Sequence, residues 1–130
     1  MNDADIYEQF KARIEAAPLY MMLVPPNSDT LPKKPYLLID VTTTNRFNRS
    51  LSGGIEKAEG ICQVTLVSET NEDESVPLLE AQKIKNLFPY GLRMGNEVLV
   101  TKPTDIKQAY RDGPDWRTPI HIEYLAHTGV

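Results

Sequence analysis

Hydrophobic residues near the start of the chain recur every four positions. Ile6, Phe10 and Ile14 form this stripe, and mostly polar residues separate them. Such spacing places the side chains on one face of a helix, so it predicts an amphipathic helix over residues 4–16. Pro18 follows two residues later and marks the end of this helix, because proline disrupts a helix interior.

A second stripe predicts a helix that begins at Ser75 and runs to about residue 87. Ala81, Ile84 and Phe88 lie three or four positions apart, and polar residues occupy most positions between them. Ser75 is a suitable N-cap, because its hydroxyl can accept a hydrogen bond from a free N–H group of the first turn.

Two further segments, residues 36–44 and 60–68, alternate between hydrophobic and polar positions. This pattern predicts strands of an antiparallel sheet that is covered on one side. The inward positions are Leu37, Ile39, Val41, Cys62, Val64 and Leu66. Further strands are expected at residues 19–24, 97–101, 106–110 and 117–125.

These elements follow the order α-β-β-β-α-β-β-β. Strands gathered in one sheet, with helices packed against it, define the α+β class. We therefore expect a single domain over residues 1–130, with a mainly antiparallel sheet and two helices packed on one face.

Two segments interrupt the regular pattern. Residues 25–35 contain four prolines, which fit neither a helix nor a central strand and predict an ordered surface loop or a polyproline-like arm. Residues 45–58 connect the two alternating segments and far exceed the length of an ordinary hairpin turn. They predict a long hairpin whose tip protrudes.

Charge and composition narrow the functional classes. The chain has 14 basic and 18 acidic residues, a net charge of −4, which argues against general nucleic-acid binding because such binding depends on a basic surface. No apolar run is long enough to span a membrane, and the N-terminus lacks the features of a signal peptide, so synthesis in a cytoplasm is expected. The charge is uneven: residues 69–74 carry four acids and no base, whereas residues 45–58 carry three bases and one acid.

Reactive groups are few and scattered along the chain. Cys62 is the only cysteine, and its hydrophobic strand pattern predicts a buried thiol. His121 and His127 are six residues apart, about 20 Å along a regular strand, which is too far for one shared metal ion. Asp112 and Asp115 flank a turn but supply too few ligands for calcium. Because no catalytic motif is present either, we expect no enzyme activity, no cofactor and no metal site.

Several of these elements together carry a resemblance. They are the first helix with Tyr7, Phe10 and Ile14, the strand at 35–41, the glycine-containing tip at 49–54, the strand at 60–67, the helix end at 81–88 and the closing strand at 119–124 after Trp116. In this arrangement the chain resembles the tail-terminator proteins of long-tailed phages, which include lambda-type tail protein U and related prophage domains. The likeness covers residues 4–126.

The resemblance implies a structural protein without an active site or cofactor. Such proteins form a hexameric ring that caps the growing tail tube and offers a surface to the head connector. The implied partners are further copies of the chain, the major tail tube protein and a head connector or neck protein, with no membrane and no sequence-specific nucleic acid. The implied location is the head–tail junction of the virion, and the implied place of synthesis is the host bacterial cytoplasm.

The connection at residues 45–58 is the candidate contact with a neighbouring subunit or with the tube, because exposed loops rarely keep several large apolar side chains without a contact to make. The candidate residues are Arg46, Phe47, Arg49, Leu51, Ile55 and Lys57. Alternatively, these side chains fold back on their own sheet. Trp116 is a candidate interface anchor, or a partly buried residue that supports the adjacent turn.

Other functions stay open at this point. A neck, head-completion or minor tail subunit of similar fold is the nearest alternative, and gene order would separate it from a terminator. A non-viral binding module belongs to another class and would stay monomeric in the presence of tail tubes. An enzyme would require a deep pocket that holds acids or bases with perturbed pKa values.

Overall fold

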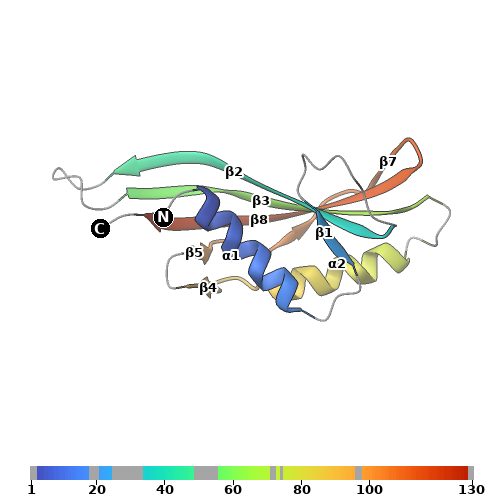
Figure 1. Ribbon diagram of the computed structural model, residues 1–130, viewed down its shortest axis with the longest axis horizontal. Helices are drawn as coiled ribbons and strands as arrows, with labels where there is room; N and C mark the ends of the chain where they lie inside the picture. Colours follow the sequence, from blue (N-terminus) through green and yellow to red (C-terminus); the bar gives the residue numbers. More distant parts are fainter. Residues whose placement is uncertain are drawn as a thin grey trace.

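The computed structural model describes residues 3–17, 21–24, 34–48, 56–70, 73, 75–95 and 98–128. Within these residues two helices lie against one eight-stranded sheet (Figure 1). The helices are α1 (Asp3–Ala16) and α2 (Ser75–Leu87). The strands are β1 (Met22–Val24), β2 (Tyr36–Asn48), β3 (Glu56–Glu69), β4 (Arg93–Met94), β5 (Val98–Val100), β6 (Asp105–Ile106), β7 (Tyr110–Asp112) and β8 (Asp115–Thr128).

Three long strands form the centre of the sheet. β3 lies between β2 and β8 and pairs antiparallel with both of them. The short strands β5, β6 and β7 pair with the other side of β8, and β4 extends the sheet beyond β5. Among the strands that the structure describes, β1 alone runs parallel to its neighbour, β2. The predicted α+β class, with a mainly antiparallel sheet, is therefore confirmed.

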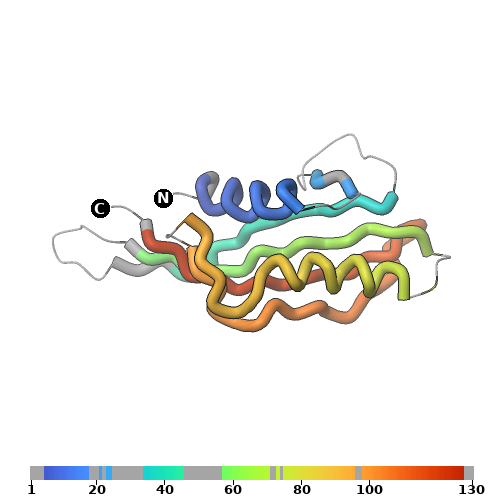
Figure 2. Tube along the Cα trace, turned by 90° about the horizontal axis from the view of Figure 1, so that it is seen from below, coloured from blue at the N-terminus to red at the C-terminus, as the bar shows by residue number. Residues whose placement is uncertain are grey.

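Both helices cover the same face of the sheet, with α1 along β2 and α2 over β3 and β8 (Figure 2). Phe10 lies inside this layer, with its ring centroid 5.6 Å from that of Phe88 and 5.5 Å from that of Tyr124. Removing these apolar side chains from water is the main source of stability for such a layer. The buried core includes Ile6, Phe10, Ile14, Leu37, Ile39, Cys62, Val64, Leu66, Ala81, Ile84, Phe88, Ile120 and Ile122.

The other face of the sheet carries a smaller buried cluster close to β1. Val24, Tyr36 and Val67 form this cluster, and Leu38 packs against it. Asp40, farther along β2, is exposed. The second face is thus apolar at the end where β1 pairs with β2 and becomes polar toward the middle of the strand.

The central strands are longer than the sequence predicted. β2 continues to Asn48 and β3 begins at Glu56, so residues 45–48 and 56–58 are paired strand residues. Pairing continues here through backbone hydrogen bonds, which require no alternation of hydrophobic side chains. The remaining connection, residues 49–55, lies outside the described residues, as do residues 25–33 of the proline-rich segment.

The region after α2 contains more strands than the sequence predicted. The strand expected at 106–110 consists of two short strands, β6 and β7, that pair with different parts of β8. β4 was not predicted, because two residues are too short to produce a recognisable alternation. β5, β6 and β7 border the long strand β8, and β4 borders β5, so these short strands widen the sheet without changing the order of the long ones.

The first turn of α2 is capped by Asp73, and not by Ser75 as predicted. Asp73 Oδ1 accepts a hydrogen bond from the backbone N–H of Ser75 at 3.0 Å, and this bond lowers the pKa of the carboxyl group. Ser75 is instead the first helical residue. A carboxylate here satisfies a free N–H group and suits the positive end of the helix dipole, which explains one member of the acidic segment at 69–74.

Candidate assembly surfaces

The reactive side chains of the described residues do not converge. The Cys62 thiol is buried, and burial raises its pKa well above the ordinary value, so it is an inert core residue. His121 Nε2 lies 3.0 Å from Gln63 Oε1, whereas His127 is exposed near the end of β8. No group of three or more potential metal-ligating side chains occurs in the described part of the chain. The candidate functional features of the described residues are therefore surfaces that could contact other proteins.

The described residues of the predicted contact loop, 45–48 and 56–58, lie at one end of the paired strands β2 and β3. Arg46 and Phe47 belong to the end of β2, and Lys57, which is half-buried, lies opposite Phe47 on β3. Arg49, Leu51 and Ile55 fall outside the described residues. The paired strands thus extend as far as Asn48 and Glu56, and the contact role of the hairpin tip stays a prediction.

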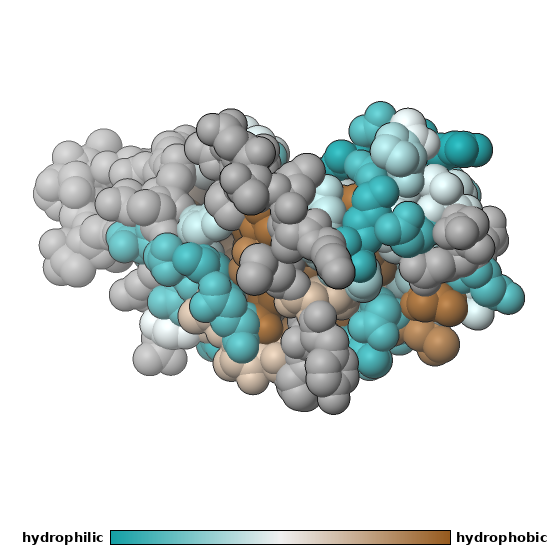
Figure 3. Space-filling view, turned by 45° about the vertical axis from the view of Figure 1, so that its right-hand side comes forward, coloured by the Kyte–Doolittle hydropathy of each residue, from teal (hydrophilic) through white to brown (hydrophobic). Residues whose placement is uncertain are grey.

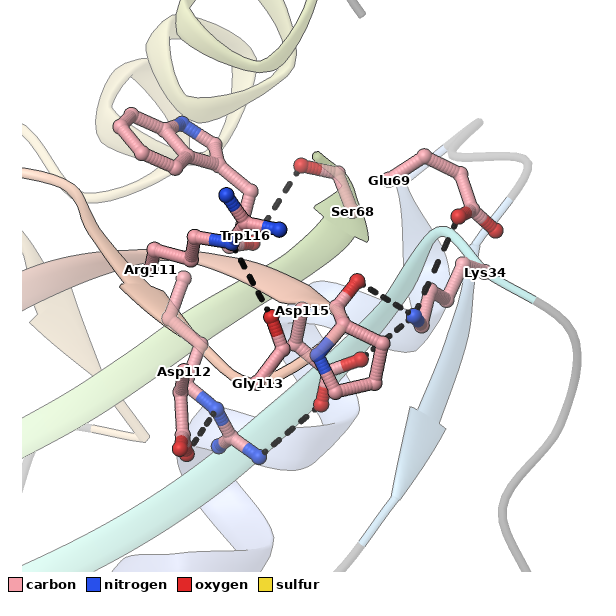
Figure 4. Close-up of polar contacts among 10 residues, drawn as sticks. Lys34, Ser68, Glu69, Arg111, Asp112, Gly113, Asp115 and Trp116 are labelled. Atoms are coloured by element: carbon pink, nitrogen blue, oxygen red, sulfur yellow. Dashed lines mark hydrogen bonds and ion pairs between the residues drawn. The ribbon is translucent and has the colours of Figure 1, made fainter. Parts of the chain in front are cut away.

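The opposite end of the molecule is held together by ion pairs around the β7–β8 turn (Figure 4). Lys34 Nζ lies 2.5 Å from Asp115 Oδ1 and donates a hydrogen bond to the carbonyl oxygen of Pro114 at 3.0 Å. Arg117 contributes from β8, with its Nε 3.1 Å from Asp112 Oδ2. Both aspartates of the turn are therefore paired with cations of the chain itself.

Trp116 lies beside this network, in a groove between α2 and the segment that follows β6. The groove has a volume of about 360 Å³. Its lining consists of Leu78, Ile106, Lys107, Gln108, Ala109 and Trp116. The indole points toward α2 (Figure 4), while the backbone oxygen of Trp116 accepts a hydrogen bond from the Ser68 hydroxyl at 3.3 Å. The residue thus supports the strand with its backbone and forms a groove wall with its side chain.

Hydrophobic side chains continue from this groove over the beginning of α2. Val76 is 46% exposed, Leu78 is 48% exposed and Leu79 is 64% exposed. Figure 3, which brings this end of the molecule forward, shows hydrophobic side chains gathered on its lower right. Large apolar side chains this close together on a surface are typical of protein contact sites. This patch was not predicted from the sequence, although Val76, Leu78 and Leu79 within one turn interrupt the polar face of the helix.

A second groove, of about 520 Å³, lies between α1, the end of α2 and β4. Arg13 and Arg93 contribute positive charge to it. However, Arg13 Nε donates a hydrogen bond to the carbonyl oxygen of Leu87, and its guanidinium group lies 6.0 Å from the centre of the Phe88 ring. Arg13 therefore fastens the two helices together, and this groove is a packing feature between them.

Comparison with known proteins identifies the family. A family model described as phage tail terminator protein matches residues 5–124. The chain belongs to the phage tail terminator family. One solved structure is 22% identical in sequence and covers 97% of this chain and 96% of its own, with a TM-score of 0.75, so it shares the fold. No protein among curated sequences matches the chain.

Membership confirms the resemblance that the sequence suggested, and it makes this protein a structural component of the phage tail and thus of the virion. The match covers α2, the groove and Trp116 together with the whole described length of the hairpin strands. Among the described residues, neither helix is long and apolar enough to cross a membrane. A structural family of this kind acts through contacts with other tail or head proteins.

Proposed function

We propose that this protein is the tail terminator subunit proper. Copies form a homo-oligomeric ring, a hexamer by the family pattern, that caps the tail tube at the head–tail junction and joins the tube to the head connector. The observation that carries this proposal is the family match over residues 5–124. The partners are a second copy of the chain, the major tail tube protein and a connector or neck protein.

The subunit works without catalysis in this proposal. The buried thiol of Cys62 and the paired aspartates of the β7–β8 turn leave these groups no free reactive role. Binding energy instead comes from repeated contacts around a closed ring, in which each subunit uses two different surfaces. The hairpin end and the groove end of the subunit provide two such unlike surfaces.

Electron microscopy of the protein mixed with its cognate tail tubes tests this function. We expect a ring at one end of each tube and no further tube growth when free tube protein is added. Tubes that lengthen at the same rate with and without the protein would contradict the proposal. A ring on isolated head connectors, with none on tubes, would instead assign the chain to the neck.

A further inference from the structure

We propose that the groove between α2 and the segment after β6, which has Trp116 in its wall, receives the hairpin tip of a neighbouring copy, residues 49–55. This inference rests on the proposed ring and names the two surfaces that join its subunits. The Leu78 side of the groove and the adjoining apolar surface of α2 form the receiving site.

The receiving site is hydrophobic and open. Leu78, Ile106, Ala109 and Trp116 supply apolar walls, and Leu78 is 48% exposed. Burying such side chains against a partner yields roughly 25 cal/mol per Å² of apolar surface removed from water. Aromatic residues in a pocket with a polar rim are also the usual centres of binding energy in protein interfaces. Lys107 and Gln108 provide that rim here.

The hairpin of the same copy cannot reach this groove. β3 has 14 residues, so its two ends lie about 43 Å apart at about 3.3 Å per residue. Glu56 starts β3 at the hairpin end, where it pairs with Thr128, and Glu69 finishes β3 beside Asp115 at the groove end. Figure 1 shows the two ends on opposite sides of the molecule. Any hairpin tip in the groove must therefore come from another copy.

The sequence of the tip suits this occupant. Residues 49–55 contain Leu51, Ile55 and the basic Arg49, with no acidic residue. In the sequence, the segment at 69–74 directly before α2 has four acids and no base, and its described acids, Glu69 and Asp73, lie at the end of β3 and at the beginning of α2. Opposite charges around an apolar contact orient two copies and disfavour contact between like ends. A contact between unlike ends is heterologous, which is the kind that generates a closed ring.

An engineered disulfide tests the contact. Ser52→Cys in the tip and Gln108→Cys in the groove are combined in one chain, which is then oxidised at high protein concentration with diamide, itself reduced to the hydrazine as the two thiols become a disulfide. Cys62 does not interfere, because it is buried. The matched control replaces Gln108→Cys by Gln82→Cys, an exposed position on α2 that does not line the groove.

We expect the Ser52→Cys/Gln108→Cys protein to give a ladder of covalent oligomers, and the control to give little. The two single variants, once mixed, should give a covalent dimer and stop there. Adding Trp116→Ala should weaken the ladder, while thermal unfolding verifies that the subunit still folds.

Equal ladders from the two double variants would overturn the inference. Absence of a ladder in a protein that still caps tail tubes would overturn it as well and leave the proposed function intact. Absence of both the ladder and capping would remove the inference and the proposed function together.

Discussion

Lys34 Nζ lies 2.5 Å from Asp115 Oδ1. This ion pair links the segment just before β2 to the first residue of β8. The same ammonium group is 3.9 Å from Glu69 Oε2 on β3. One cation thus joins three parts of the chain at the groove end of the sheet. The hydrogen bond from Lys34 to Asp115 raises the pKa of Lys34 above its ordinary value.

This pair predicts a loss of stability in alkaline solution. A lysine whose pKa is higher in the folded state stabilises the fold fully below its unfolded pKa of about 10.4, and this contribution disappears as the pH rises through the folded pKa. The Lys34→Met variant should lose this part of the alkaline dependence. Thermal unfolding followed by circular dichroism between pH 8 and pH 12 measures it. Parallel curves for variant and parent would contradict the prediction.

Gly60 lies where the neighbouring strands leave no room for a larger side chain. A Cβ atom at this position would lie 2.8 Å from Tyr124 Oη and even closer to the carbonyl oxygen of Thr42. Gly60→Ala should therefore destabilise the protein by about 1–3 kcal/mol in urea unfolding, since backbone must shift to make room. Adding Tyr124→Phe removes only the contact with the hydroxyl and leaves those with the backbone of Thr42 and Thr43, so it should restore stability only in part. Full recovery would place the clash on the tyrosine alone.

Phe10 should contribute strongly to the stability of the layer between the helices and the sheet. Its ring is fully buried against Phe88 and Tyr124. Phe10→Ala should cost about 3–5 kcal/mol, because it removes apolar contacts and leaves a cavity. Urea unfolding provides the value, and Glu8→Ala on the exposed face of α1 is the matched control, with an expected change within about 0.5 kcal/mol. Similar losses in the two variants would show that α1 is not anchored by this ring.

Asp73 predicts acid sensitivity at the beginning of α2. Its pKa is lowered by the hydrogen bond from the Ser75 backbone. A carboxyl group with a lowered folded pKa stabilises the fold above its unfolded pKa of about 3.9, and the contribution is lost as the pH falls through the folded value. Asp73→Asn keeps an acceptor oxygen and should retain most of the cap near neutral pH while losing this acid dependence. Unfolding midpoints between pH 2 and pH 7 distinguish the two proteins. If the variant loses stability at low pH as steeply as the parent, Asp73 is not the source of the acid sensitivity.

The regular elements were predictable because their burial repeats over several turns or pleats. Phe10 and Ile84 belong to stripes that only a helix places on one face, and both are fully buried. The parallel pairing of β1 with β2 was not predictable, since side-chain alternation is the same in parallel and antiparallel strands. The Lys34–Asp115 pair joins positions far apart in sequence, and no local pattern connects them.

The candidate surfaces were predictable only in part. Trp116 was recognised as an unusual residue beside a turn, and the structure places it in the wall of a groove, but its interface role stays a prediction. The hairpin residues were selected by their mixture of basic and large apolar side chains, and their contact also stays a prediction. The groove itself required the fold, because α2 and the segment after β6 meet only through their positions around β8.

The borders of the sheet bear on how this protein avoids the wrong kind of self-association. β4 is only two residues long, and the pairing of β2 with β3 shifts between Thr43 and Asn45. Short or bulged outer strands are poor templates for the backbone of a passing chain. At high protein concentration, copies are thereby discouraged from stacking strand on strand into fibrils, and side-chain surfaces are left to select their neighbours.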